Sequence, residues 1–227
     1  MTTLESTNDL VIARECKLQE YIKKKAALRY RMHGLANLDS EWFNGLRALN
    51  FGEMHHTEYR KDNITPAYMH QVDIANHIMT LLPHLMFPAR TIIAILLHDT
   101  PEDTAVSHEE IRDKFGVNTM VDVELLTKEY RGEKKDINSY FAEISNSPVA
   151  SIGKGGDRIL NQATMVGVFA LQKQISYCTE TRTHFFKMLK NARRLFPEQE
   201  LAYENLKFTM LSQLQIFEAI NAKGAAA

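Results

Sequence analysis

The segment LLHDTPEDT at residues 96–104 joins an apolar run to a histidine and three acidic residues. Imidazole nitrogen and carboxylate oxygen together suit Mn²⁺, Fe²⁺, Zn²⁺, Ni²⁺ or Co²⁺, whereas Ca²⁺ and Mg²⁺ prefer oxygen ligands alone. His98 and Asp99 would be costly to bury without such a cation. Neighbouring residues on a helix point about 100° apart, so both reach one ion only near a helix end or close to its axis. An isolated HD pair is more often a solvated helix end, so a metal site needs partners elsewhere in the chain.

Two other segments supply candidate partners. His70 and His77 are seven residues apart in YMHQVDIANHIMTLL, so they share a helix face and one of them could be a ligand. Further on, Asp157 and Asn161 share one face of the helix predicted after the glycine-rich stretch KGG. An aspartate at a helix start can also be an N-cap. The carboxylate and amide on one face favour a site over a simple cap.

The elements that must position these residues are predicted to be helical throughout. Apolar residues recur at helical spacing, and strand-like alternation is rare. Ser107 begins a capping box with Glu110, and Gly116 ends the helix that follows. The fold class is therefore expected to be all-α. The predicted elements are helices over 8–32, 68–82, 87–100 and 117–128, a short helix pair over 33–50, a loop over 54–65, a loop with one helix over 128–148, a glycine-rich turn feeding a helix over 151–168, and two helices over 176–221.

Composition narrows the class of protein. The chain has 227 residues, of which 44% are hydrophobic, which is enough for a sizeable core. With a formal net charge of −1, the protein has no overall excess of positive charge that would favour binding to nucleic acid or to a membrane surface. Cys16 and Cys178 form no CxxC pair and indicate reduced thiols in an intracellular protein. The N-terminus lacks the pattern of a signal peptide, and no apolar run is long enough to span a membrane, so we expect a cytoplasmic protein.

The order His…His-Asp…Asp resembles the HD metal-dependent phosphohydrolases. More closely, RKDNITPAYMH, HDTPEDT, FG, LTK and KGGDRILN resemble, in order, the motifs of the hydrolase domain of RelA/SpoT homologues. The resemblance covers roughly residues 51–195. It predicts an N-terminal helical extension over 1–50, a hydrolase domain over 51–195, and a C-terminal helix and tail over 196–227. Because the chain leaves no room for a synthetase domain, it is similar to the stand-alone small alarmone hydrolases.

The resemblance implies an HD-domain helical bundle that uses Mn²⁺, and it assigns roles by position. The metal ligands would be His70, His98, Asp99 and Asp157. Glu102 and Asp103 match the acidic pair around the attacking water. The residues matching family positions near the substrate are Arg60, Lys61, Lys154, Arg158 and Asn161. The second histidine of the helix, His77, is then expected to be a core or rim residue.

The implied reaction removes the 3′-pyrophosphate from (p)ppGpp or (p)ppApp. Alternatives that keep the site are a 2′-phosphatase acting on NADPH or another nucleotide phosphohydrolase. An alternative of another class is an antitoxin or binding protein that neutralises a toxic alarmone synthetase. Substitution of Asp99 separates these classes, because protection by contact would survive it and protection by hydrolysis would not.

Two departures from the family pattern bear on the substrate pocket. Gly155 and Gly156 stand where the family usually has a bulkier residue and alanine, which predicts a wider base pocket. Phe185 stands at a position where some stand-alone members have tyrosine, which would keep ring stacking and lose a hydroxyl contact.

Overall fold

Helices make up nearly all of the regular structure in residues 7–224, the part of the chain that the computed structural model describes. A short antiparallel hairpin of β1 (Glu129–Tyr130) and β2 (Glu133–Lys134) interrupts them. The predicted all-α class is therefore confirmed. The α-helices are α1 (Thr7–Ala36), α2 (Trp42–His55), α3 (Met69–Ile78), α4 (Pro88–Leu97), α5 (Thr100–Asp103), α6 (His108–Phe115), α7 (Val117–Leu126), α8 (Ile137–Ser145), α9 (Pro148–Thr164), α10 (Leu171–Glu180), α11 (Phe186–Leu195) and α12 (Glu200–Gly224).

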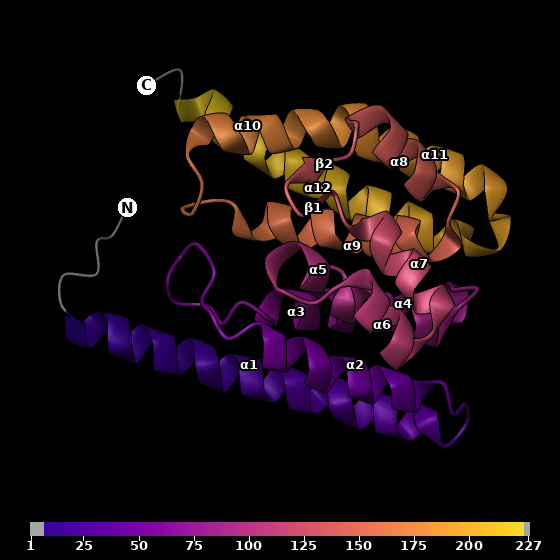
Figure 1. Ribbon diagram of the computed structural model, residues 1–227. Helices are drawn as coiled ribbons and strands as arrows, with labels where there is room; N and C mark the ends of the chain where they lie inside the picture. Colours follow the sequence, from indigo (N-terminus) through magenta and orange to yellow (C-terminus); the bar gives the residue numbers. More distant parts are fainter. Residues whose placement is uncertain (1–6, 225–227) are drawn as a thin grey trace.

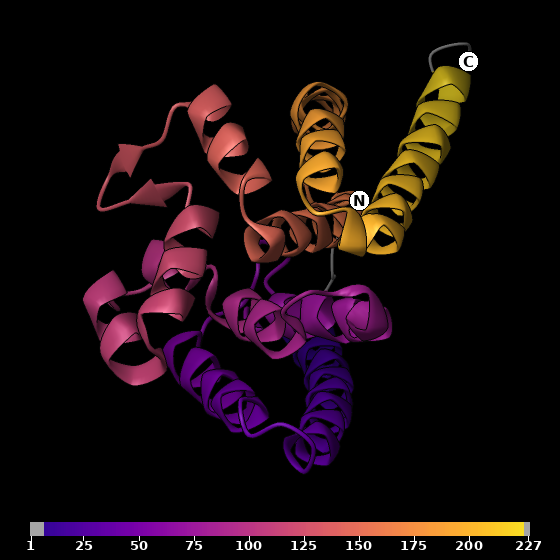
Figure 2. The ribbon, with the colours of Figure 1, turned by 90° about the vertical axis from the view of Figure 1, so that its right-hand side faces the viewer.

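The helices stack in layers, which Figures 1 and 2 show from two directions. Helices α1 and α2 form the indigo outer layer and pack on α3 and α4. On the opposite side of α3 and α4 lies α9, and α12 packs along α9 in turn. Because α9 contacts both α3 and α4, residues distant in sequence meet where these three helices pack together.

Helix α4 is the buried centre that its sequence predicts. Its residues from Ile92 to Leu97 are at most 1% exposed. Fully burying each large aliphatic side chain stabilises the fold by about 1.5–3 kcal/mol. Rotating or sliding α4 in the core would therefore be costly. Pro88 fits the first turn, where a backbone N–H needs no partner within the helix. The helix therefore holds the buried His98 and the half-buried Asp99 at a fixed position at its end.

The helix start predicted at Ser107 is confirmed. The Ser107 hydroxyl oxygen accepts a hydrogen bond from the Glu110 N–H over 3.2 Å, which caps α6. At the other end, Gly116 has a φ of 89°, a backbone conformation that side chains with a Cβ disfavour. These two residues fix the length of α6.

Several predicted boundaries were wrong. Residues 33–50 do not form a helix pair, because α1 runs to Ala36 and α2 alone carries Trp42. The helix predicted over 68–82 ends at Ile78 and continues as the 3₁₀ segment η1 (Met79–His84), which passes through Pro83. The region 176–221 contains parts of three α-helices rather than two, with the π-helical turn η2 (Thr181–Phe185) and the 3₁₀ turn η3 (Pro197–Gln199) between them.

The glycine-rich segment is part of a helix and not a turn. Gly155 and Gly156 lie inside α9, which is continuous from Pro148 to Thr164. A Cβ at Gly155 would lie 2.8 Å from Leu206 Cδ1, and one at Gly156 would lie 2.8 Å from Ile74 Cγ2. The glycines therefore let α12 and α3 approach α9 closely, and the expected widening of a base pocket is wrong.

Helix α1 is attached to the rest of the fold by polar contacts as well as by packing. The Tyr21 hydroxyl lies 2.7 Å from a Glu53 carboxylate oxygen on α2, and Lys24 forms an ion pair with Asp73 on α3 at 2.9 Å. The proposed boundaries at residues 50 and 195 stay predictions. Among residues 7–224, no helix is long and apolar enough to cross a bilayer.

Candidate active site

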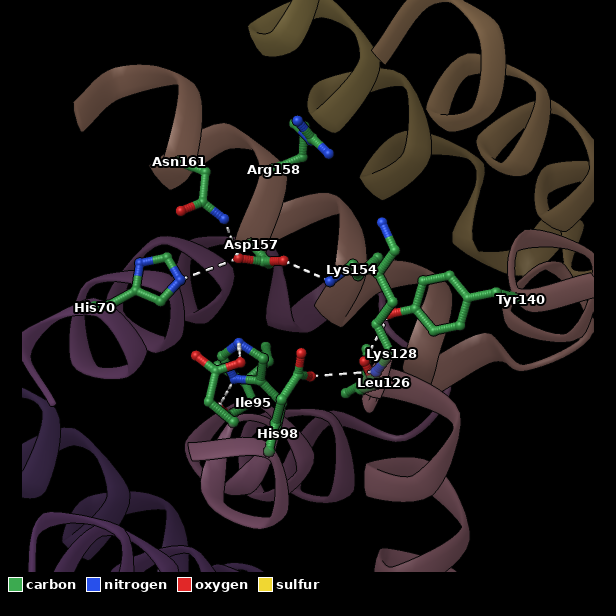
Figure 3. A network of polar contacts seen from close by, with 12 residues as sticks. His70, Ile95, His98, Leu126, Lys128, Tyr140, Lys154, Asp157, Arg158 and Asn161 are labelled. Atoms are coloured by element: carbon green, nitrogen blue, oxygen red, sulfur yellow. Dashed lines mark hydrogen bonds and ion pairs between the residues drawn. The ribbon is translucent and has the colours of Figure 1, made fainter. Parts of the chain in front are cut away.

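One cavity of about 1440 Å³ gathers most of the residues singled out in the sequence. Ten of the eleven predicted site residues line it, and His98 lies buried behind them. Figure 3 shows the polar contacts that connect the cavity walls. The lining includes Arg60, Lys61, His70, Asp99, Glu102, Asp103, Lys154, Asp157, Arg158 and Asn161.

The ends of α3 and α4 bring three potential metal ligands together. His70, His98 and Asp99 each offer a ligand atom, and these atoms lie within 4.8 Å of one another. The His98 Nδ1 is 2.8 Å from the Ile95 carbonyl oxygen, which fixes the ring. Its buried Nε2 is 3.0 Å from an Asp99 oxygen but lacks hydrogen-bond geometry to any partner. An orphaned buried nitrogen beside a carboxylate fits a divalent cation, which would accept both donor atoms.

Asp157 reaches this group from the middle of α9, not from a helix start as predicted. Its Oδ1 lies 3.0 Å from His70 Nε2 and accepts a hydrogen bond from the Asn161 amide over 2.5 Å. Its Oδ2 accepts a hydrogen bond from the Lys154 ammonium over 2.7 Å. Asp157 therefore contacts one of the three potential ligands directly, whereas His70, His98 and Asp99 alone form the group whose ligand atoms all lie within 4.8 Å of one another.

Burial and neighbouring charges determine the protonation of this cluster. Burial raises the pKa of Asp157, but Lys154 and His70 outweigh it and hold the pKa well below its usual value. Burial similarly opposes ionisation of Asp99, yet His98 lowers the pKa of Asp99 to about 2. For His98, burial lowers the pKa, while Asp99 raises it to about 9 overall. Burial lowers the pKa of His70. The cluster thus keeps the buried Asp157 carboxylate and the half-buried Asp99 carboxylate ionised.

Glu102 and Asp103 lie on the short helix α5, directly after the HD pair. The Lys128 N–H donates a hydrogen bond to Glu102 Oε2 over 3.2 Å. Burial raises the pKa of both carboxyl groups, and the Asp99 charge raises them further. Carboxylates with raised pKa values that are held at a cavity wall are suited to receive a proton from water.

Cationic residues line the same cavity as this acidic cluster. Arg60 donates a long hydrogen bond of 3.5 Å to the side-chain oxygen Oδ1 of Asn161, which connects the 57–65 loop to α9. The Lys61 ammonium lies 5.3 Å from the centre of the Phe169 ring. Lys154 is partly buried, and although burial lowers its pKa, Asp157 holds that pKa well above its usual value. The cavity therefore combines fixed positive charge with potential metal ligands, an arrangement suited to a phosphorylated ligand.

The sequence reasoning missed several residues that hold the site in place. Gln71 is 2% exposed and donates a hydrogen bond to Asp99 Oδ2 over 3.2 Å. Lys128 belongs to the LTK motif, but its contacts with Glu102 and Glu180 were not anticipated. No local pattern marked Glu180. His77 does not line the cavity, as expected, and burial lowers its pKa.

Comparisons with known proteins agree with this architecture. A family model described as HD domain matches residues 48–134. Over 140 residues the chain is 31% identical to a guanosine-3′,5′-bis(diphosphate) 3′-pyrophosphohydrolase from Aquifex aeolicus. The matched region covers 60% of this chain and 19% of that protein. It is 30% identical over 125 residues to a probable GTP pyrophosphokinase from Mycobacterium leprae, covering 52% of this chain and 15% of that protein. The chain thus spans about a fifth or less of these relatives.

A solved structure has a similar fold. It is described as a metazoan ortholog of SpoT that hydrolyses ppGpp and plays a role in starvation responses. The TM-score is 0.56 at 21% identity, and the match covers 72% of this chain and 93% of the other. The resemblance predicted from the motifs is confirmed: residues 48–134 match the HD domain, the chain is similar in sequence to a 3′-pyrophosphohydrolase, and its fold is similar to that of a SpoT ortholog.

Proposed function

We propose that this chain is a Mn²⁺-dependent hydrolase that removes the 3′-pyrophosphate from (p)ppGpp or (p)ppApp. The observation that carries the proposal is the meeting of three groups in one cavity. These are the ligand set His70, His98 and Asp99, the carboxyl pair of Glu102 and Asp103, and the cations Arg60, Lys61 and Lys154. The name of the Aquifex relative supports the choice of bond.

His70, His98, Asp99 and Asp157 would hold the metal ion, since they combine imidazole nitrogen with carboxylate oxygen. When bound, Mn²⁺ supplies Lewis-acid polarisation of the phosphoryl group. Gln71 orients Asp99, and Asn161 and Lys154 orient Asp157, through the hydrogen bonds described above. Partners of this kind fix the direction of ligand atoms before the ion binds.

Side chains of the protein carry out the other parts of the proposed reaction. Glu102, held by the Lys128 N–H, orients the attacking water and takes its proton, with Asp103 beside it. The water oxygen bonds to the phosphorus of the 3′ ester, and the bond between that phosphorus and the ribose oxygen breaks. The ribose oxygen takes up a proton from solvent, and Glu102 returns to solvent the proton that it took from the water. The products are a nucleotide with a free 3′-hydroxyl and pyrophosphate. Arg60, Lys61 and Lys154 place positive charge where negative charge gathers.

The proposal is tested with purified protein and Mn²⁺ against ppGpp, pppGpp, ppApp and NADPH, with products separated by ion-exchange chromatography. We expect pyrophosphate from at least one of the first three substrates, and none from the Asp99→Ala variant. Release of orthophosphate from NADPH alone would replace the proposal with the 2′-phosphatase. Absence of turnover in the presence of bound metal would overturn it.

The binding-protein alternative is tested in cells that express a toxic alarmone synthetase. If the chain protects by hydrolysis, Asp99→Ala abolishes protection. Protection that survives this substitution would assign the chain to the class of binding proteins.

A further inference from the structure

Lys128 connects two walls of the cavity through two different atoms. Its backbone N–H donates to Glu102 Oε2 on α5 over 3.2 Å. Its side-chain ammonium donates to Glu180 Oε1, at the end of α10, over 3.1 Å. Any force that displaces the Lys128 side chain therefore also pulls on the peptide that holds Glu102.

Glu180 is itself fixed from the opposite side. Its second carboxylate oxygen pairs with the Arg158 guanidinium on α9. The Arg158 side chain is 7% exposed, and its guanidinium carbon lies 4.2 Å from the centre of the Phe185 ring and 4.5 Å from that of Tyr177. A planar cation packed against two rings has little freedom to turn toward a ligand. Arg158 thus serves as the anchor of Glu180.

The charges of the three residues support a lasting contact. Burial raises the pKa of Glu180, but Arg158 and Lys128 outweigh it and lower the pKa overall. The carboxylate is therefore ionised at neutral pH. The π-helical turn η2 begins directly after Glu180 and carries Phe185, which packs on Arg158. An inserted π-turn shifts the register of the helix beyond it, and such turns are frequent at functional sites.

These contacts form one continuous series that joins different parts of the cavity lining. It runs from α9 through Arg158 to Glu180 on α10, on to Lys128 before β1, and ends at Glu102 on α5. Its first member, Arg158, directly follows Asp157 in sequence. This series of contacts therefore links Glu102, the proposed water-activating carboxylate, to α9, the helix that carries the proposed metal ligand Asp157.

We infer that Arg158, Glu180 and Lys128 form a positioning relay, a series of contacts that fixes the position of Glu102 relative to Asp157. This inference rests on the proposed function. It replaces the sequence-based expectation that Arg158 contacts the substrate, because Arg158 acts through Glu180. Arg158 and Glu180 are positioning residues, whereas Glu102 remains the group that meets the water.

The test uses Glu180→Gln, which keeps the size of the side chain and removes its charge. We expect kcat for the best alarmone substrate to fall about 10- to 100-fold. KM and the dissociation constant for Mn²⁺, measured by calorimetry, stay near wild-type values. The matched control is Glu218→Gln, which removes the exposed pair between Glu218 and Arg182 of η2 and leaves kcat unchanged.

A second variant, Lys128→Met, breaks the relay while leaving the buried Arg158–Glu180 pair intact. Combined with Glu180→Gln it should cause little additional loss of kcat, because both changes break the same contact. Additive losses, or an unchanged kcat in Glu180→Gln, would overturn the relay.

Amide hydrogen exchange tests the relay without turnover. The Lys128 N–H should lose protection in both Glu180→Gln and Lys128→Met and keep it in Glu218→Gln. If wild-type protein hydrolyses no alarmone but these exchange changes occur, the proposed function fails and the relay stands. Unchanged protection of Lys128 in a folded Glu180→Gln variant would contradict the relay, whatever the substrate.

Discussion

His70 Nε2 on α3 lies 3.0 Å from Asp157 Oδ1 on α9, so two residues 87 positions apart in sequence meet at one point of the cavity. The contact exists because α3 and α9 pack closely through Gly156. It brings the fourth proposed ligand to the group formed by His70, His98 and Asp99. Packing and proposed chemistry therefore depend on the same helix pair.

Asp157→Asn should weaken metal binding and also destabilise the metal-free protein. Lys154, whose side chain is 14% exposed, would lose its carboxylate partner, and an unpaired buried charge costs about 3–5 kcal/mol. Thermal unfolding with and without Mn²⁺ measures both effects. The double variant Asp157→Asn/Lys154→Met should recover much of the unfolding temperature but not the affinity for Mn²⁺. Recovery of both would remove Asp157 from the ligand set.

Gly156→Ala should destabilise the protein although alanine favours helices. The new Cβ would lie 2.8 Å from Ile74 Cγ2, and such overpacking costs about 1–3 kcal/mol. The matched control is Gly34→Ala in α1, where a Cβ meets nothing within 4 Å and the gain is up to about 1 kcal/mol. Urea unfolding at constant slope gives both values. A Gly156→Ala variant as stable as Gly34→Ala would show that α3 and α9 do not pack in this way.

How far the sequence could predict this arrangement is clear from α4 and α9. The apolar run of α4 and the cap at Ser107 are local signals, and both predictions were confirmed. Gly155 and Gly156 were mistaken for a turn because glycine usually marks one. Their actual role, which is to admit Leu206 and Ile74, depends on the tertiary contacts of α9 with α12 and α3. No local pattern records such contacts.

The candidate site, like the fold, could be predicted only in part from the sequence. Family motifs predicted the residues that line the cavity, since these motifs carry the acidic, imidazole and cationic groups. They did not predict the partners that orient those groups. Glu180 lies outside every motif, and its role depends on tertiary contacts with Arg158 and Lys128. Gln71 was not among the predicted site residues, although it donates to Asp99.

Gln71→Met should weaken Mn²⁺ binding while preserving the volume of the side chain. Asp99 would lose the hydrogen bond that orients its Oδ2, and loss of such a partner typically reduces metal affinity about 10- to 100-fold. Calorimetric titration measures the change. Gln162→Met is the matched control, because Gln162 is also buried but donates to Thr181 away from the ligands. Equal affinities in the two variants would exclude an orienting role for Gln71.

The attachment of α1 should weaken in acid. Burial raises the pKa of Glu53, but hydrogen bonds from Lys25 and Tyr21 outweigh it and lower the pKa below its unfolded value of 4.5. A depressed carboxyl pKa contributes stability that is present above the unfolded value and lost as pH falls through the folded one. Wild type should therefore lose stability below about pH 4.5 more steeply than Glu53→Gln. Parallel curves from urea unfolding at several pH values would contradict this role of Glu53.

We propose that the residues around Asp99 remove an intact pyrophosphate from the 3′ position. The product ratio when ppGpp is incubated with the Mn²⁺-loaded protein tests this reaction. We expect GDP and pyrophosphate in equal amounts, with neither product formed after chelation of the metal. Orthophosphate as the first product, or an intact substrate in the presence of bound Mn²⁺, would contradict it.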